Sequence, residues 1–198
     1  NEIDRGDWYR VFMNNYTVKM YDVTCENINA SAVINTYTAY GKSIFEPFGR
    51  VKTKYTVTPS GRLDIESEFE TDSNKLNFLP RFGLRTFVDK SFDKVSYYGF
   101  GPYESYIDKH RSSFRHLYES TAERLHEDYL KPQENGSHWD CSLVQAGDGD
   151  TTLQVTGDGF SFNASPYTQE ELSDTFLKLA ASEIGETELL DWILRHER

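Results

Sequence analysis

Residues 51–70 read VKTKYTVTPSGRLDIESEFE, and this stretch decides the fold class. In each half, uncharged side chains alternate with lysine and threonine or with acidic residues, as in a strand with one buried and one solvated face. Pro59-Ser60-Gly61-Arg62 between the halves is typical of a turn. We therefore predict an antiparallel hairpin, whose basic first strand faces an acidic second strand and is held in register by cross-strand charge pairs.

The segments on both sides of this hairpin also have the composition of strands. Two segments rich in Tyr, Thr, Val and Ile precede it, at 16–24 and 28–40. Short strand candidates follow it at 84–88, 95–98, 142–145, 152–155 and 160–163. Glycine–aspartate turns at 147–150 and 157–159 separate the last three. Helix is expected only near the C-terminus, at a capping box of Thr168 and Glu171 and over 186–198. The pattern predicts a mainly β, antiparallel sandwich in a single domain, 1–198.

The composition agrees with a β-rich domain and narrows the partners. Aromatic residues make up 15% of the 198 residues, and the net charge is −11. A negative field of this size repels phosphate and anionic lipid, so we expect neither nucleic acid nor membrane as a partner. No apolar run is long enough to cross a bilayer, and no signal peptide is visible. Cys25 and Cys141 are predicted to be free, mostly buried thiols in the cytoplasm, with one disulfide as the alternative.

Two runs combine glycine, proline, aromatic and acidic residues too densely for an ordinary strand or helix. They are Tyr98-Gly99-Phe100-Gly101-Pro102-Tyr103-Glu104-Ser105-Tyr106 and Lys131-Pro132-Gln133-Glu134-Asn135-Gly136-Ser137-His138. Each is predicted to be a loop of fixed shape that serves a site or an interface. Glu104 and Glu134 could form a glycosidase carboxylate pair. We favour the alternative, in which they accept hydrogen bonds from loop amides and fix the loop shape.

Other side chains in or near these loops are weaker candidates. His110 and His138 could be general acids or bases, since histidine titrates near neutral pH, or they could be structural. Tyr103, Tyr106, Trp139 and Tyr167 could stack on sugar rings, although core packing is the more common use of such residues. The histidines have no metal-ligand spacing, so we expect no metal site and no cofactor in this chain.

Three ordered motifs carry a family resemblance. They are Gly99-Phe100-Gly101-Pro102-Tyr103-Glu104-Ser105-Tyr106-Ile107-Asp108-Lys109, Tyr129-Leu130-Lys131-Pro132-Gln133-Glu134-Asn135-Gly136 and Phe160-Ser161-Phe162-Asn163-Ala164-Ser165-Pro166-Tyr167-Thr168. The chain resembles the C-terminal β-sandwich domain, or small chain, of bacterial β-galactosidases of glycoside hydrolase family 2. It departs from the family in Lys109, where arginine is common, and in the absence of the family's Gly-rich stretch after Ser182.

The resemblance implies a supersandwich like that of galactose mutarotase and a division of labour. The family's catalytic glutamates lie in a separate TIM barrel, so this chain alone is expected to be inactive, and any Mg or Na would bind in that catalytic domain. The chain would pack on the barrel, or on a large chain that contains it, help to complete the pocket for terminal β-galactosides such as lactose, and belong to an oligomer. The domain is expected to be incomplete at both ends.

The resemblance also implies site residues. The edge of the galactoside pocket would include Asn1, Glu2, Asp4 and Arg5. The shaped loops would contact sugar or the catalytic domain through Tyr103, Glu104, Asp108, His110, Glu134 and His138. Two alternatives stay open. One is a freestanding sugar-binding or aldose-epimerase-like sandwich, in which one of these histidines and glutamates moves a proton at an anomeric centre. The other is an interaction domain that serves assembly only.

Overall fold

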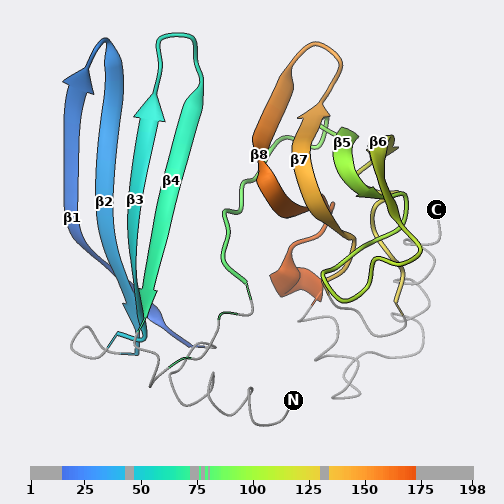
Figure 1. Cartoon of the computed structure of the whole chain (residues 1–198), viewed down its shortest axis with the longest axis horizontal. Helices are drawn as coiled ribbons and strands as arrows, with labels where there is room; N and C mark the ends of the chain where they lie inside the picture. Colours follow the sequence, from blue (N-terminus) through green and yellow to red (C-terminus); the bar gives the residue numbers. More distant parts are fainter. Residues whose placement is uncertain are drawn as a thin grey trace. The chain divides into compact units, whose positions relative to one another are not determined.

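The computed structural model of the chain describes residues 15–42, 47–71, 76, 79, 81–129 and 134–172. The chain divides into two compact units, residues 1–84 and 85–198. Each unit contains one antiparallel sheet of four strands, as Figure 1 shows. The prediction of a mainly β, antiparallel fold is therefore confirmed. Stacking of the two sheets into one supersandwich stays a prediction.

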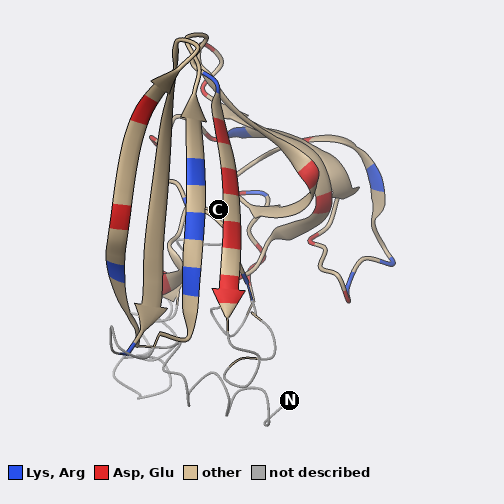
Figure 2. Cartoon of the chain, turned by 60° about the vertical axis from the view of Figure 1, so that its left-hand side comes forward, with Lys and Arg blue, Asp and Glu red and all other residues tan. Residues whose placement is uncertain are grey.

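The first sheet contains the predicted hairpin. Its strand order is β1-β2-β3-β4, with bounds β1 (Thr17–Ile28), β2 (Ser31–Gly41), β3 (Gly49–Val57) and β4 (Leu63–Thr71). Basic positions of β3 face acidic positions of β4 (Figure 2). Lys54 Nζ lies 3.3 Å from Glu66 Oε1. Lys52 forms an ion pair with Glu70, two positions along from Glu68, its partner in the register. Such exposed pairs each contribute at most about 1 kcal/mol. They therefore help to select the register more than they stabilise the sheet.

The turn between β1 and β2 holds two residues in the left-handed region. Asn29 has φ of 50° and Ala30 has φ of 67°. Turns of this kind match the right-handed twist of the flanking strands, which is why two-residue hairpins favour them. Asparagine tolerates this conformation, whereas the Cβ of alanine makes it unfavourable. The predicted end of the first strand at residue 24 was wrong by a few residues, because β1 continues through Ile28 and the turn follows it.

Replacing Ala30 by glycine is expected to stabilise the protein. Relief of the left-handed strain is worth about 1–2 kcal/mol, and the extra freedom of glycine in the unfolded chain offsets part of it, which leaves a gain of about 0.5–1 kcal/mol. Urea unfolding measures the change. Ala32→Gly, two residues on in β2, is the matched control and should lower stability by about 0.5–1 kcal/mol. A loss of stability in Ala30→Gly would contradict the strain argument.

The second sheet carries the better-packed core. Its order is β6-β5-β7-β8, with bounds β5 (Lys94–Gly101), β6 (Phe114–Thr121), β7 (Ser137–Gly147) and β8 (Thr152–Asn163). The buried cluster consists of Val95, Tyr97, Leu125, Cys141 and Val144. Partly buried aromatic side chains pack against it from β6 and β8, namely Tyr118, Phe160 and Phe162. The central strands β5 and β7 thus supply most of the buried side chains.

The first of the two dense runs begins inside a strand, which corrects the prediction that all of it is a loop. Gly101 is the last residue of β5, and Gly99 lies two positions before it. A Cβ on Gly99 would lie 2.1 Å from the Cys141 sulfur, and a Cβ on Gly101 would lie 2.3 Å from the Tyr97 hydroxyl. These glycines are needed for close packing between neighbouring side chains and backbone. Composition alone does not distinguish that use of glycine from a turn.

Three further strand predictions need correction. Residues 84–88 form no strand, and β6 is a strand that the sequence pattern missed because it lacks clean alternation. The predicted turn at 157–159 lies within the continuous strand β8. There, Gly159 has φ of 64°, opposite an irregular stretch of β7 in which Asp140 has φ of 51°. The glycine–aspartate signal therefore marks a bulged pairing, whereas the similar signal at 147–150 is a real turn.

The predicted helix start near the C-terminus is confirmed. A helix begins at residue 169, and the Glu171 amide donates to Thr168 Oγ1 at 3.1 Å. In return the Thr168 amide donates to Glu171 Oε2 at 2.7 Å, which completes the capping box. The helix expected over 186–198 lies outside the described residues.

Both cysteines are free, as expected, but their environments differ. Cys141 is fully buried, and burial raises the pKa of its thiol to about 12. Cys25 is exposed on the edge strand β1, which corrects the prediction that both thiols are buried. Among the described residues, no helix is long and apolar enough to cross a membrane.

Candidate functional site

The structure brings the two dense runs together around one carboxylate. The chain leaves β5 through a cis Gly101–Pro102 peptide, and the loop that follows carries Glu104 and Ser105 before β6 begins. The second run leads into β7, which pairs with β5. Because β5 and β7 are antiparallel neighbours, the end of the first run lies beside the end of the second, where β7 begins. The Ser105 amide donates to the Ser137 carbonyl at 2.6 Å and joins them directly.

Glu104 is buried and is surrounded by hydrogen-bond donors. One carboxylate oxygen accepts hydrogen bonds from Lys109 Nζ and Tyr129 Oη. The other accepts from the Gly136 amide at 3.0 Å and from Tyr106 Oη at 3.2 Å. We call these five residues the Glu104 cluster. A buried carboxylate is stable only when donors replace the water that it loses, and here four donors do so.

The charges of the Glu104 cluster are fixed at neutral pH. Burial would raise the pKa of Glu104, but the hydrogen bonds from Lys109, Tyr129 and Gly136 outweigh that effect and hold its pKa below the ordinary value. The bond to Glu104 raises the pKa of Lys109, and burial together with the Glu104 charge raises the pKa of Tyr106 to about 12. No member therefore exchanges a proton near neutral pH, as a general acid or base must. The cluster has the properties of a structural brace.

Side-chain oxygens tie further backbone groups of the two runs. Ser105 Oγ donates to the Phe100 carbonyl at 3.0 Å and accepts from the Trp139 amide at 2.9 Å. Asn135 Oδ1 accepts from the Glu127 amide at 2.9 Å. These bonds support the hypothesis that polar side chains in the runs fix loop shape. The expectation of fixed loops holds for the part between β5 and β6, although the first run starts as a strand.

His138 is a core residue. It is 1% exposed, its Nδ1 donates to the Phe100 carbonyl at 3.2 Å, and its ring packs against those of Tyr97 and Phe162 at centroid distances of 4.5 and 5.3 Å. Within the described part of the chain its Nε2 has no hydrogen-bond partner. Burial lowers the pKa of His138, so the ring is neutral at pH 7. Its burial favours the structural role over that of a general acid or base.

His110 lies at the edge of an aromatic group. Its Nδ1 donates to the Tyr106 carbonyl at 3.0 Å, and its ring lies 4.3 Å from that of Trp139. Phe100 completes the group, 5.1 Å from Trp139. Trp139 thus packs against its own chain, and Tyr167 packs edge-on against His126 at 5.0 Å. These contacts agree with the packing role for both residues.

The remaining predicted site residues do not join the Glu104 cluster. Tyr103 and Asp108 are exposed on the same loop, and Glu134 is exposed at the start of the described part of the second run. Both oxygens of Glu104 are occupied, which argues against its use in a catalytic pair with Glu134. The predicted residues Asn1, Glu2, Asp4 and Arg5 lie outside the described residues. In the described ranges, no group of three His, Cys, Asp or Glu side chains could hold a metal ion.

Sequence reasoning missed three partners of Glu104, although all lie in the quoted motifs. Lys109 is the last residue of the first motif, and Tyr129 is the first residue of the second. Gly136 contributes only its backbone amide. A motif quotes residues together without saying which side chain is buried. The sequence signal for these contacts is the Glu–x–Tyr spacing followed by a basic residue. It indicates a hydrogen-bonded cluster only when Glu104 is known to be buried.

Comparisons with known proteins agree on one family. A family model described as "Beta galactosidase small chain" matches residues 1–183. A β-galactosidase of Actinobacillus pleuropneumoniae is 40% identical over 129 residues, which are 64% of this chain and 12% of that protein. A β-galactosidase of Staphylococcus xylosus is 36% identical over 143 residues, 72% of this chain and 14% of that protein. The chain therefore aligns with only a small part of the length of these relatives.

Proposed function

Since the chain belongs to the β-galactosidase small chain family, we propose that it is the non-catalytic domain or small subunit of a β-galactosidase. It packs on the catalytic TIM barrel and helps to complete the pocket in which terminal β-galactosides are hydrolysed. The catalytic glutamates, and any Mg or Na, belong to the barrel. The two free thiols fit a protein that works in the cytoplasm.

The loop between β5 and β6 is the observation that carries the proposal. It exposes large apolar side chains on both sides of the Glu104 cluster: Tyr103 is 62% exposed, Ile107 is 75% exposed, and Phe114, where β6 begins, is 63% exposed. A loop held in shape by a buried carboxylate while it presents apolar side chains has the properties of a binding surface. A rigid loop of this kind also loses little conformational entropy when it docks.

The use of Glu104 supports the assignment of catalysis to another domain. Among the described residues it is the one carboxylate that is buried, and both of its oxygens bind structural donors. A glycosidase acid needs a raised pKa, whereas the pKa of Glu104 is lowered. The environment of Glu104 thus favours a role as a brace for the docking loop.

Association with a barrel-containing large chain tests the proposal. We expect the mixture to co-elute in size-exclusion chromatography and to hydrolyse a lactose analogue, with neither chain active alone. Ile107→Asp should weaken association by about tenfold or more, because it places a charge at the apolar tip. Val18→Asp, on exposed β1 of the other unit, is the control and should have little effect. Absence of both co-elution and hydrolysis would refute the proposal.

Removal of residues 1–6 separates pocket completion from assembly. Because that segment would border the galactoside pocket, its loss should weaken binding of a galactoside inhibitor to the complex while association is kept. If inhibitor affinity does not change, the chain serves assembly only.

A further inference from the structure

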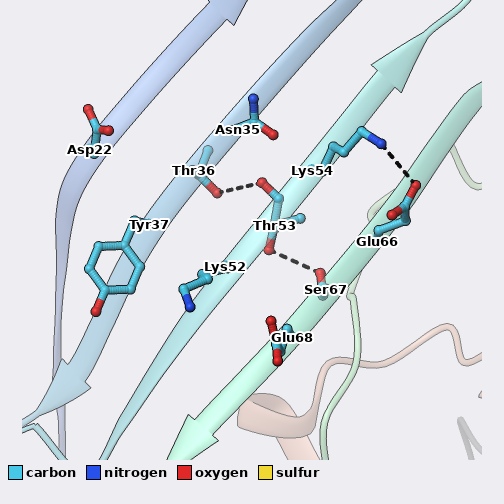
Figure 3. A pocket seen from close by; sticks show the side chains of 10 residues that line it. All are labelled: Asp22, Asn35, Thr36, Tyr37, Lys52, Thr53, Lys54, Glu66, Ser67 and Glu68. Carbon is cyan, nitrogen blue, oxygen red and sulfur yellow. Dashed lines mark hydrogen bonds and ion pairs between the residues drawn. The ribbon is translucent and has the colours of Figure 1, made fainter.

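An open depression lies on the charged face of the first sheet, far along the chain from the Glu104 cluster. It has a volume of about 540 Å³. The lining residues come from all four strands and are shown in Figure 3: Asp22, Asn35, Thr36, Tyr37, Lys52, Thr53, Lys54, Glu66, Ser67 and Glu68. Volumes of about 300–1,000 Å³ are typical of sites for small organic ligands. The proposed function gives this depression no role.

The strand register arranges polar groups of different kinds in rows across this face. Asp22, Tyr37, Lys52 and Glu68 form one row, each paired with the next on the neighbouring strand. Two positions along, a second row contains Asn35, Lys54 and Glu66. A row across four strands spans about 14 Å. Carboxylate, amide, ammonium and phenol groups therefore repeat along a length suited to an extended ligand.

A β-bulge adds a second aromatic ring to this face. The register of β1 shifts between Met20 and Asp22, so Tyr21 is the extra residue. The Tyr21 ring lies 5.8 Å from that of Tyr37, and Lys19 Nζ lies 4.9 Å from the Tyr21 ring. Bulges often re-aim a side chain near a functional site. Here the bulge places Tyr21 beside Tyr37 while Asp22 keeps its place in the row.

The chemistry of the lining favours an uncharged ligand rich in hydroxyl groups. Three carboxylates and two ammonium groups line the depression, so a strongly charged ligand meets groups of both signs. Asp22 and Glu68 contribute carboxylate oxygens to the lining, and such oxygens can accept hydrogen bonds from ligand hydroxyl groups. Aromatic rings offer flat apolar surfaces to the C–H faces of a sugar. We propose that this face of β1–β4 binds a neutral oligosaccharide.

Titration of the full 198-residue chain with lactose and with a β-1,4-linked galactotetraose, followed by amide NMR shifts, tests this proposal directly. We expect millimolar binding, stronger for the tetraose, with shifts confined to residues around the depression. Tyr37→Ala should weaken tetraose binding by about tenfold. Tyr55→Ala is the matched control, because Tyr55 lies between Lys54 and Thr56 on β3 and its side chain alternates to the opposite face.

A second variant guards against a failure of Tyr37→Ala to fold. Asp22→Ala changes an exposed residue of edge strand β1 and should also weaken binding, with the thermal unfolding curve unchanged. No shift with either sugar, or equal weakening by Tyr37→Ala and Tyr55→Ala, would overturn the proposal. The test needs no catalytic partner, so its outcome does not depend on whether the chain associates with a barrel.

Discussion

Gly136→Ala is expected to lower the free energy of unfolding by about 3 kcal/mol, which combines left-handed strain with overpacking. Gly136 has φ of 70°, and a Cβ there would lie 2.1 Å from the Leu125 carbonyl oxygen. That oxygen is a backbone atom, so it cannot move aside as the end of a flexible side chain can. Any shift of Gly136 also displaces the amide that donates to Glu104. Urea or thermal unfolding measures the loss.

Gly61→Ala is the control that separates strain from crowding. Gly61 has φ of 82° in the turn between β3 and β4, but a Cβ there would meet no atom within 4 Å. It should therefore lose only about 1 kcal/mol, the cost of the left-handed conformation. Equal losses in the two variants would show that the approach of Gly136 to Leu125 has no energetic weight.

Glu104→Gln is expected to cost about 2 kcal/mol at neutral pH, because an amide cannot replace a carboxylate that accepts from four donors. Whichever way the glutamine is turned, its NH₂ group faces either Lys109 and Tyr129 or Tyr106 and the Gly136 amide. One pair of donors thus loses its acceptor. Glu66→Gln, which removes an exposed ion pair with Lys54, is the matched control and should cost less than about 1 kcal/mol.

The difference between wild type and Glu104→Gln should also depend on pH. The folded pKa of Glu104 is lowered, so its stabilisation is fully present above the unfolded pKa, about 4.3, and is lost as pH falls through the lower folded value. The stability gap is therefore expected to narrow below about pH 4.3. Unfolding midpoints at several pH values measure it. A gap that stays constant into the acid range would contradict the assignment of a charged carboxylate.

Local patterns predicted the parts of the fold that depend on alternation and turns. The β3–β4 hairpin and the Thr168 capping box could be predicted because neighbouring residues determine them. Strand β6 could not be predicted because its sequence lacks clean alternation, and the continuous course of β8 could not because the glycine–aspartate signal of its bulged pairing resembles that of a turn. Gly99 illustrates the limit. A glycine is needed there because the Cys141 side chain, 42 positions away, leaves no room for a Cβ, and no local pattern in the sequence shows that contact.

The candidate site was predicted to a similar extent. The motifs located both runs, and the preference for a loop-shaping Glu104 over a catalytic one agrees with its four donors. The resemblance to the β-galactosidase small chain is confirmed by the family match. What the motifs did not reveal is which side chains are buried. His138 and Tyr103 stand in similar sequence surroundings, yet one is 1% exposed and the other 62%.

The bond between Glu104 and the Gly136 amide joins segments 32 positions apart. An amide held in this way exchanges its proton with water only when the bond opens, and opening would leave a buried carboxylate short of a donor. The two loops should therefore open together or not at all. The Gly136 proton then reports on both loops at once, and its exchange rate would show whether a docked partner slows that shared opening.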